Sequence, residues 1–74
     1  MLVKLVKALK TAKKINDELI NLYNSKSVEC YKSGDEAGHK YWNDRTYAII
    51  CQNKQIDEDI RKLKEEAGVN ADQN

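Results

Sequence analysis

Apolar residues recur at alternating steps of three and four along the first third of the chain, the spacing of one face of an amphipathic helix. They are Leu5, Ala8, Ala12, Ile15, Leu19 and Leu22, and the stripe is widened by Leu9 and Tyr23. Asn24-Ser25-Lys26-Ser27 weakens the pattern, because Ser and Asn compete for backbone hydrogen bonds. We interpret Cys30 as continuing the stripe and predict one helix over about residues 3–32, with a break near Ser25 as the alternative.

A second helix is predicted over about residues 36–67 from a heptad pattern. Its stripe is Trp42, Ile49, Ile56 and Leu63, and Thr46, Asn53, Ile60 and Ala67 lie four residues on from each. Gly68 is placed to end this helix. Residues 68–74 offer little to pack, so we expect a frayed tail.

The turn is predicted at about residues 33–35, where Ser33-Gly34-Asp35-Glu36 has the S-x-x-E form of a capping box with Ser33 as the cap. A short turn makes consecutive helices antiparallel neighbours. Leu19 should then lie opposite Ile49, and Asn16 near Asn53. The fold class is therefore predicted as all-α, an antiparallel two-helix hairpin over residues 1–67.

Asn16 and Asn53 allow two interpretations, and the sequence leaves both open. Polar residues that pair inside a helix seam fix its register at a cost in stability. Alternatively, both side chains lie at the solvent edge and have no structural role.

Several apolar residues remain outside the two stripes, and a pair of helices cannot enclose them. Tyr47-Ala48-Ile49-Ile50-Cys51 is apolar on every side of a helix, which is typical of a segment covered from more than one direction. We expect dimerisation into a four-helix bundle, or coverage by an unidentified partner protein. The predicted partner or dimer interface is Tyr47, Ile50, Cys51, Val6, Ile20 and Trp42.

Trp42 also allows two interpretations, because it lies on the heptad seam and tryptophan is a common interface anchor. It is either a core residue of the hairpin or a partner contact. In the antiparallel arrangement Lys26 approaches it, which would permit a cation–π contact.

The residues with chemical potential are few. Cys30 and His39 flank the turn, but a zinc site needs four ligands and only Asp35 and Glu36 are near. As a nucleophile pair they lack an orienting residue. In the hairpin Cys30 and Cys51 are roughly 20 Å apart, whereas bridged Cα atoms lie about 4.4–6.8 Å apart. We therefore predict no disulfide, no metal, no cofactor and no enzymatic activity.

A row of lysines on the first helix supports a second hypothesis, nucleic-acid binding. Residues 1–14 contain five lysines and no acid, and a basic helix can contact phosphates. The candidate phosphate contacts are Lys4, Lys7, Lys10 and Lys14. Against this, the hairpin brings acidic residues to the same end, namely Asp57, Glu58, Glu65 and Glu66. Membrane binding is disfavoured because helix two is expected to occupy the apolar stripe.

The amino-acid composition further limits the class of protein. The 74 residues carry 13 basic and 12 acidic side chains and no proline, which suits one small helical domain without a strong net field. The amino-terminal lysines interrupt any signal-peptide core, so we expect a cytoplasmic protein. The excess of lysine over arginine follows AT-rich codons and indicates a low-GC bacterium or its phage.

The function predicted from the sequence is a small regulator or inhibitor that covers a partner protein's surface. One version is a phage or mobile-element product that antagonises a host system. The alternatives are the nucleic-acid-binding module and a structural subunit of a larger assembly.

Overall fold

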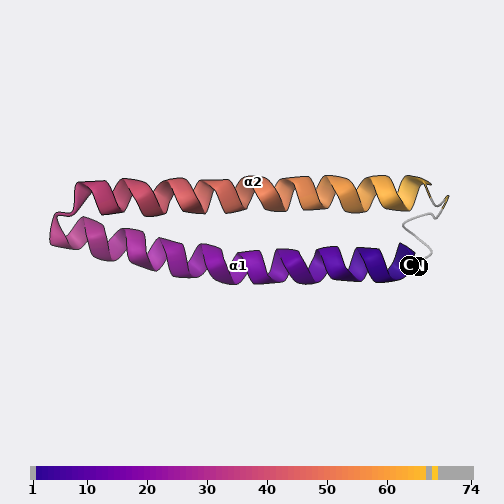
Figure 1. Cartoon of the computed structure of the whole chain (residues 1–74), viewed down its shortest axis with the longest axis horizontal. Coiled ribbons are helices and arrows are strands. Elements are labelled where there is room, and N and C mark those ends of the chain that lie inside the picture. Colours follow the sequence, from indigo (N-terminus) through magenta and orange to yellow (C-terminus); the bar gives the residue numbers. More distant parts are fainter. Residues whose placement is uncertain (1, 67, 69–74) are drawn as a thin grey trace.

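The computed structural model describes residues 2–66 and 68. Two helices, α1 (Leu2–Ser33) and α2 (Glu36–Glu66), lie side by side and antiparallel in a rod of 52 × 19 × 14 Å (Figure 1). The all-α hairpin predicted from the sequence is confirmed. α1 passes through Ser25 without a break, so the alternative with three shorter helices is wrong. Apart from Gly68, the predicted frayed tail lies outside the described residues.

The turn ends α1 with a left-handed glycine. Gly34 has φ +80°, its N–H donates to the Tyr31 carbonyl, and the Asp35 N–H donates to the Cys30 carbonyl. These two bonds form a Schellman motif, which satisfies carbonyls that the end of a helix leaves unpaired. The chain therefore reverses within Gly34 and Asp35 alone.

Asp35, rather than Ser33, caps α2. The Asp35 Oδ1 accepts a hydrogen bond from the Gly38 N–H at 2.9 Å, while the Ser33 hydroxyl donates backwards to the Cys30 carbonyl at 3.1 Å. The predicted role of Ser33 as the cap is wrong, because Ser33 is the last residue of α1 and its hydroxyl is used there. Asp35 also places a negative charge at the positive end of the α2 dipole.

Gly38 lets the first turn of α2 approach α1 closely. A Cβ added at Gly38 would lie 2.7 Å from the Cys30 Sγ and 2.4 Å from the Asp35 Oδ2. Those distances are shorter than ordinary contacts of a Cβ atom, so the side chains of Asp35 and Cys30 would have to move. Gly38 is thus a close-packing position between the two helices.

The face that α1 turns toward α2 is shifted by one residue from the predicted stripe. Leu5, Ile15 and Leu22 are 49%, 52% and 52% exposed, so the predicted stripe lies largely outside the hairpin interface. The positions that are buried or half-buried instead repeat at steps of three and four. They are Val6, Leu9, Lys13, Asn16, Ile20, Tyr23, Ser27 and Cys30, and only Ala12 and Leu19 of the predicted stripe are half-buried beside them.

α2 contributes the seam that its heptads predict. Its buried or half-buried positions include Trp42, Thr46, Ile49, Asn53, Ile56, Ile60 and Leu63. Among the described hydrophobic residues only Ile49 is fully buried, whereas Ser27, Thr46 and Asn53 are buried polar residues. The centre of the hairpin is therefore unusually polar for a helix interface.

Hydrogen bonds between the helices explain the shifted phase. Asn53 accepts from the Asn16 amide at 3.0 Å and donates to the Asp17 carboxylate at 3.0 Å. Lys13 binds Asp57 through contacts of 2.8 and 3.1 Å. Leaving the buried Asn53 unpaired would cost about 1–3 kcal/mol, so α1 rotates its polar seam inward. Asn16 and Asn53 therefore pair across the seam, and the interpretation that both lie at the solvent edge without a structural role is wrong.

Candidate protein-binding surfaces

Half of the predicted interface lies on the outer side of α2. Tyr47 is 69% exposed and Ile50 is 39% exposed, and Cys51 is exposed beside them. We call these three residues the α2 patch. A tyrosine ring and an isoleucine side chain lose little hydration energy on burial, and tyrosine is a common residue at protein contacts.

The other half of the predicted interface lies within the hairpin. Val6 and Ile20 are half-buried in the seam of α1, so their assignment to the outside was wrong. This follows from the one-residue shift in phase, which carries both residues inward.

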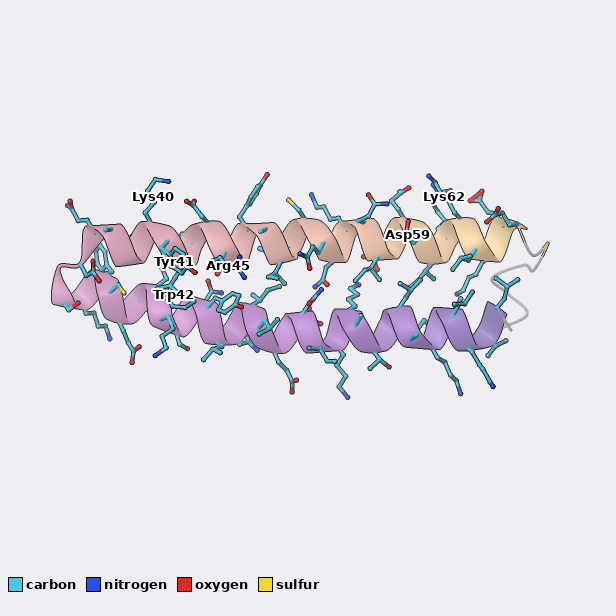
Figure 2. The ribbon with its side chains drawn as sticks, in the orientation of Figure 1. Lys40, Tyr41, Trp42, Arg45, Asp59 and Lys62 are labelled. Atoms are coloured by element: carbon cyan, nitrogen blue, oxygen red, sulfur yellow. The ribbon has the colours of Figure 1, made fainter. Side chains whose placement is uncertain are left out.

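Trp42 is also half-buried and packs inside the molecule. Its ring lies 5.3 Å from the Tyr23 ring. It also lies 4.9 Å, edge on, from the ring of Tyr41, and both Tyr41 and Trp42 are labelled in Figure 2. Arg45 extends over the Tyr23 ring with its guanidinium carbon 5.8 Å from the centroid. Lys26 instead pairs with Glu29 at 3.9 Å. The cation–π contact in the structure joins Arg45 to Tyr23, so the predicted contact of Lys26 with Trp42 is wrong. The core interpretation of Trp42 describes this arrangement.

One further surface was missed from the sequence because it was assigned to the core. Leu5, Ala8, Ile15 and Leu22 are exposed along the outside of α1, with Ala12 and Leu19 half-buried at the margin toward α2. We call these six residues the α1 apolar face. A signal was present: Leu9, Asn16, Tyr23 and Cys30 are spaced by sevens and mark the true seam.

The lysine row lies in solvent. Lys4, Lys7, Lys10 and Lys14 are all exposed, and none forms an ion pair with a residue in the described part of the chain. Three of the four acids expected to neutralise them form ion pairs with other residues. Asp57 pairs with Lys13, and both Glu58 and Glu65 pair with Arg61.

The polar side chains near the turn are engaged with one another. His39 Nδ1 lies 3.0 Å from the Ser27 carbonyl, and His39 Nε2 lies 3.2 Å from the Asn43 amide nitrogen. The Ser27 hydroxyl donates to the Asn43 Oδ1 at 2.7 Å. Both nitrogens of the ring therefore have partners, with Nδ1 as donor and Nε2 as acceptor in the neutral ring.

The environment of Cys30 favours the protonated form of its thiol. Burial raises the pKa of the Cys30 thiol, and the carboxylate of Asp35 raises that pKa further. A raised pKa lowers the fraction of thiolate, which is the reactive form. The residues described contain no group of three His, Cys, Asp or Glu side chains arranged to hold a metal ion.

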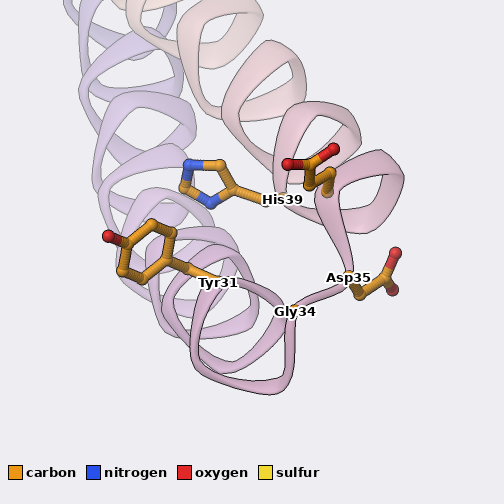
Figure 3. A pocket seen from close by; sticks show the side chains of 5 residues that line it. Tyr31, Gly34, Asp35 and His39 are labelled. Atoms are coloured by element: carbon orange, nitrogen blue, oxygen red, sulfur yellow. The ribbon is translucent and has the colours of Figure 1, made fainter.

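A shallow hollow of about 250 Å³ opens beside the turn (Figure 3). It is lined by Tyr31, Gly34, Asp35, Glu36 and His39. The Tyr31 and His39 rings meet across it with centroids 5.4 Å apart. It is smaller than the clefts of about 300–1,000 Å³ that hold small-molecule ligands.

The structure is a helical hairpin with polar residues along the interface between its helices. It has two exposed apolar regions, the α2 patch and the α1 apolar face. No protein-family model, curated protein or solved structure matches the chain. Over the described residues, neither helix has the length of apolar sequence that crossing a bilayer requires.

Proposed function

We propose that this protein is a small, non-catalytic protein-binding module that regulates or inhibits a partner by covering its surface. The observation that supports this is the distribution of apolar side chains. Ile49 is the one buried hydrophobic residue among those described, whereas ten large hydrophobic residues are exposed. They are Leu2, Val3, Leu5, Ile15, Leu22, Val28, Tyr31, Tyr41, Tyr47 and Ile50.

The energetic argument follows from that distribution. Fully burying a leucine or isoleucine contributes about 1.5–3 kcal/mol, so a partner that covers several half-exposed side chains gains several kcal/mol. A two-helix hairpin has no other way to remove these side chains from water. Both a second copy, which would complete a four-helix bundle, and a different protein supply the missing surface.

We assign the α2 patch to the partner protein. Tyr47 is more exposed than Ile50, at 69% against 39%, and tyrosines at the centre of an apolar patch are among the residues whose truncation most weakens binding. Ile50 lies one turn further along the helix and extends the patch.

The test compares Tyr47→Asp with Gln52→Asp. Gln52 is also exposed on α2, so it provides a matched control for the added charge. The immobilised wild type and Gln52→Asp should retain the same protein from a low-GC bacterial lysate, and Tyr47→Asp should lose at least about 90% of it. Equal retention by all three proteins would contradict the assignment of the patch.

Nucleic-acid binding is the second candidate, and the exposure of Lys4, Lys7, Lys10 and Lys14 favours it. If they contact phosphates, affinity for duplex DNA should fall steeply with salt, with a slope of about −0.9 per phosphate neutralised. Changing all four to glutamate should abolish binding. Changing Lys54, Lys62 and Lys64 of α2 instead should not. Weak binding that is equal in both variants would reject this candidate.

A further inference from the structure

The α1 apolar face has a symmetric spacing. Its six residues follow one another at steps of three, four, three, four and three, which read the same in either direction along the helix. The centre of the face lies level with Lys13 and Lys14. Lys13 turns toward α2, where it binds Asp57.

A symmetric stripe can pair with an antiparallel copy of itself. Such pairing sets Leu5 opposite Leu22 and Ala8 opposite Leu19, and it sets Ala12 opposite Ile15 at the centre. Each alanine then faces a large side chain. Alternation of small and large residues across facing positions is what lets two helices interdigitate closely.

We propose that a second copy of this chain occupies the α1 apolar face, with the two α1 helices antiparallel about a twofold axis near Lys13 and Lys14. This inference rests on the proposed interaction function and names the partner for one of its surfaces. The resulting contact is isologous, because each copy contributes the same residues.

Charge complementarity supports the antiparallel orientation. Residues 2–14 of α1 contain five lysines and no acid, and the acids of α1 all follow, at Asp17, Glu18 and Glu29. An antiparallel pair places the basic half of each helix beside the half with the acids, with Lys7 near the partner's Glu18. A parallel pair would place the two lysine rows level with each other, which is unfavourable.

The geometry leaves the α2 patch available. Ile50 lies two turns before Asp57, on the flank of the hairpin where Asp57 meets Lys13 and Asp17 meets Asn53. The α1 apolar face lies on the opposite flank of the hairpin. Each of its residues stands one position before a seam residue of α1, whereas Asp17 stands one position after the seam residue Asn16. The dimer can therefore still present two α2 patches to a partner protein.

The first test is sedimentation of the wild type against a triple variant, Leu5→Ser with Ile15→Ser and Leu22→Ser. The matched control is Val3→Ser with Val28→Ser and Tyr31→Ser, whose side chains are 68%, 49% and 73% exposed on the same helix. The wild type and the control should sediment at twice the chain mass of 8.5 kDa. The triple variant should sediment as a monomer, with self-association weaker by at least about 100-fold.

The second test fixes the orientation and needs no destabilising change. In a background with Cys30→Ser and Cys51→Ser, mixing Leu5→Cys with Leu22→Cys should give a cross-linked dimer on oxidation. Neither variant should cross-link alone, because the two positions lie roughly 25 Å apart along a helix. Cross-linking of Leu5→Cys with itself would overturn the antiparallel arrangement.

Other outcomes also decide the matter. A monomeric wild type, or a triple variant that remains dimeric, would overturn the inference. Suppose that the wild type is a monomer and binds vesicles, and that the triple variant does not; the α1 apolar face then binds a lipid surface. If the triple variant instead fails to retain a lysate protein that the monomeric wild type retains, the face binds a foreign protein. A monomer that still retains a protein through Tyr47 leaves the proposed function standing. If the wild type is a dimer but retains no protein through Tyr47, the proposed function is rejected and the dimer inference stands.

Discussion

Asn53 shows how a single side chain can decide the packing of this molecule. It is buried against α1, and its amide both accepts from Asn16 and donates to Asp17. A one-residue rotation of α1 would bring more apolar surface inward but would separate these groups. The hydrogen bonds therefore outweigh the gain in apolar contact, as expected when the alternative is a buried amide without partners.

Replacing Asn53 with alanine should lower the free energy of unfolding by about 1–2 kcal/mol, because Asn16 loses its partner and the seam loses volume. A double-mutant cycle with Asn16→Ala should show a coupling of about 0.5–1.5 kcal/mol. Urea unfolding of the four proteins gives both values. Additive effects would show that the two amides do not interact.

Cys30 and Cys51 should differ in reactivity. Cys51 is exposed, while burial and Asp35 raise the pKa of Cys30 and so lower its thiolate fraction at any pH below that pKa. A maleimide should label Cys51 first at pH 7, and the labelling rate of Cys30 should keep rising at higher pH. Mass spectrometry of the Cys30→Ser and Cys51→Ser variants separates the two rates.

Asp35→Asn provides the control for the charge. Asparagine is as good a helix cap as aspartate, so the turn should keep its structure while the negative charge beside Cys30 is lost. Labelling of Cys30 should become faster and that of Cys51 should stay the same. An equal change at both cysteines would mean that the hairpin had loosened.

The turn between α1 and α2 is held by backbone geometry and a cap. Gly34 adopts a left-handed conformation and has open space where a side chain would begin. A substitution there tests backbone strain alone, since no neighbour is displaced.

Gly34→Ala should lower the free energy of unfolding by about 1–2 kcal/mol, because an L-residue in the left-handed region is strained. Gly34→Asn should cost less, since asparagine tolerates that region. The midpoint of thermal unfolding, followed by circular dichroism, should be highest for the wild type, lower for Gly34→Asn and lowest for Gly34→Ala. Equal stability of the alanine variant would show that the turn adopts another conformation.

The molecule as a whole has a long interface and a small core. Two helices of 32 and 31 residues meet along a seam that includes Lys13, Asn16, Ser27 and Asn53. Such an interface specifies register well but contributes little hydrophobic free energy. Self-association would add apolar burial that the single hairpin lacks.

The midpoint of thermal unfolding should consequently rise with protein concentration. For a dimer of this size, a hundredfold increase should raise it by about 5–10 °C. The Leu5→Ser, Ile15→Ser and Leu22→Ser variant should show no such dependence. A constant midpoint for the wild type would argue that the hairpin is stable alone.

The sequence by itself determined the two helices, the turn near Gly34 and the antiparallel register, because periodicity, a glycine and matched stripe lengths are local signals. It also placed Asn16 near Asn53, with pairing as one of two open interpretations, and it placed Tyr47 outward. Only the tertiary structure decided which face of α1 turns inward. Two stripes one residue apart compete there, and the choice depends on polar partners such as Asp57 that the chain supplies from the other helix. That choice moved Val6 and Ile20 inside and left Leu5, Ile15 and Leu22 outside.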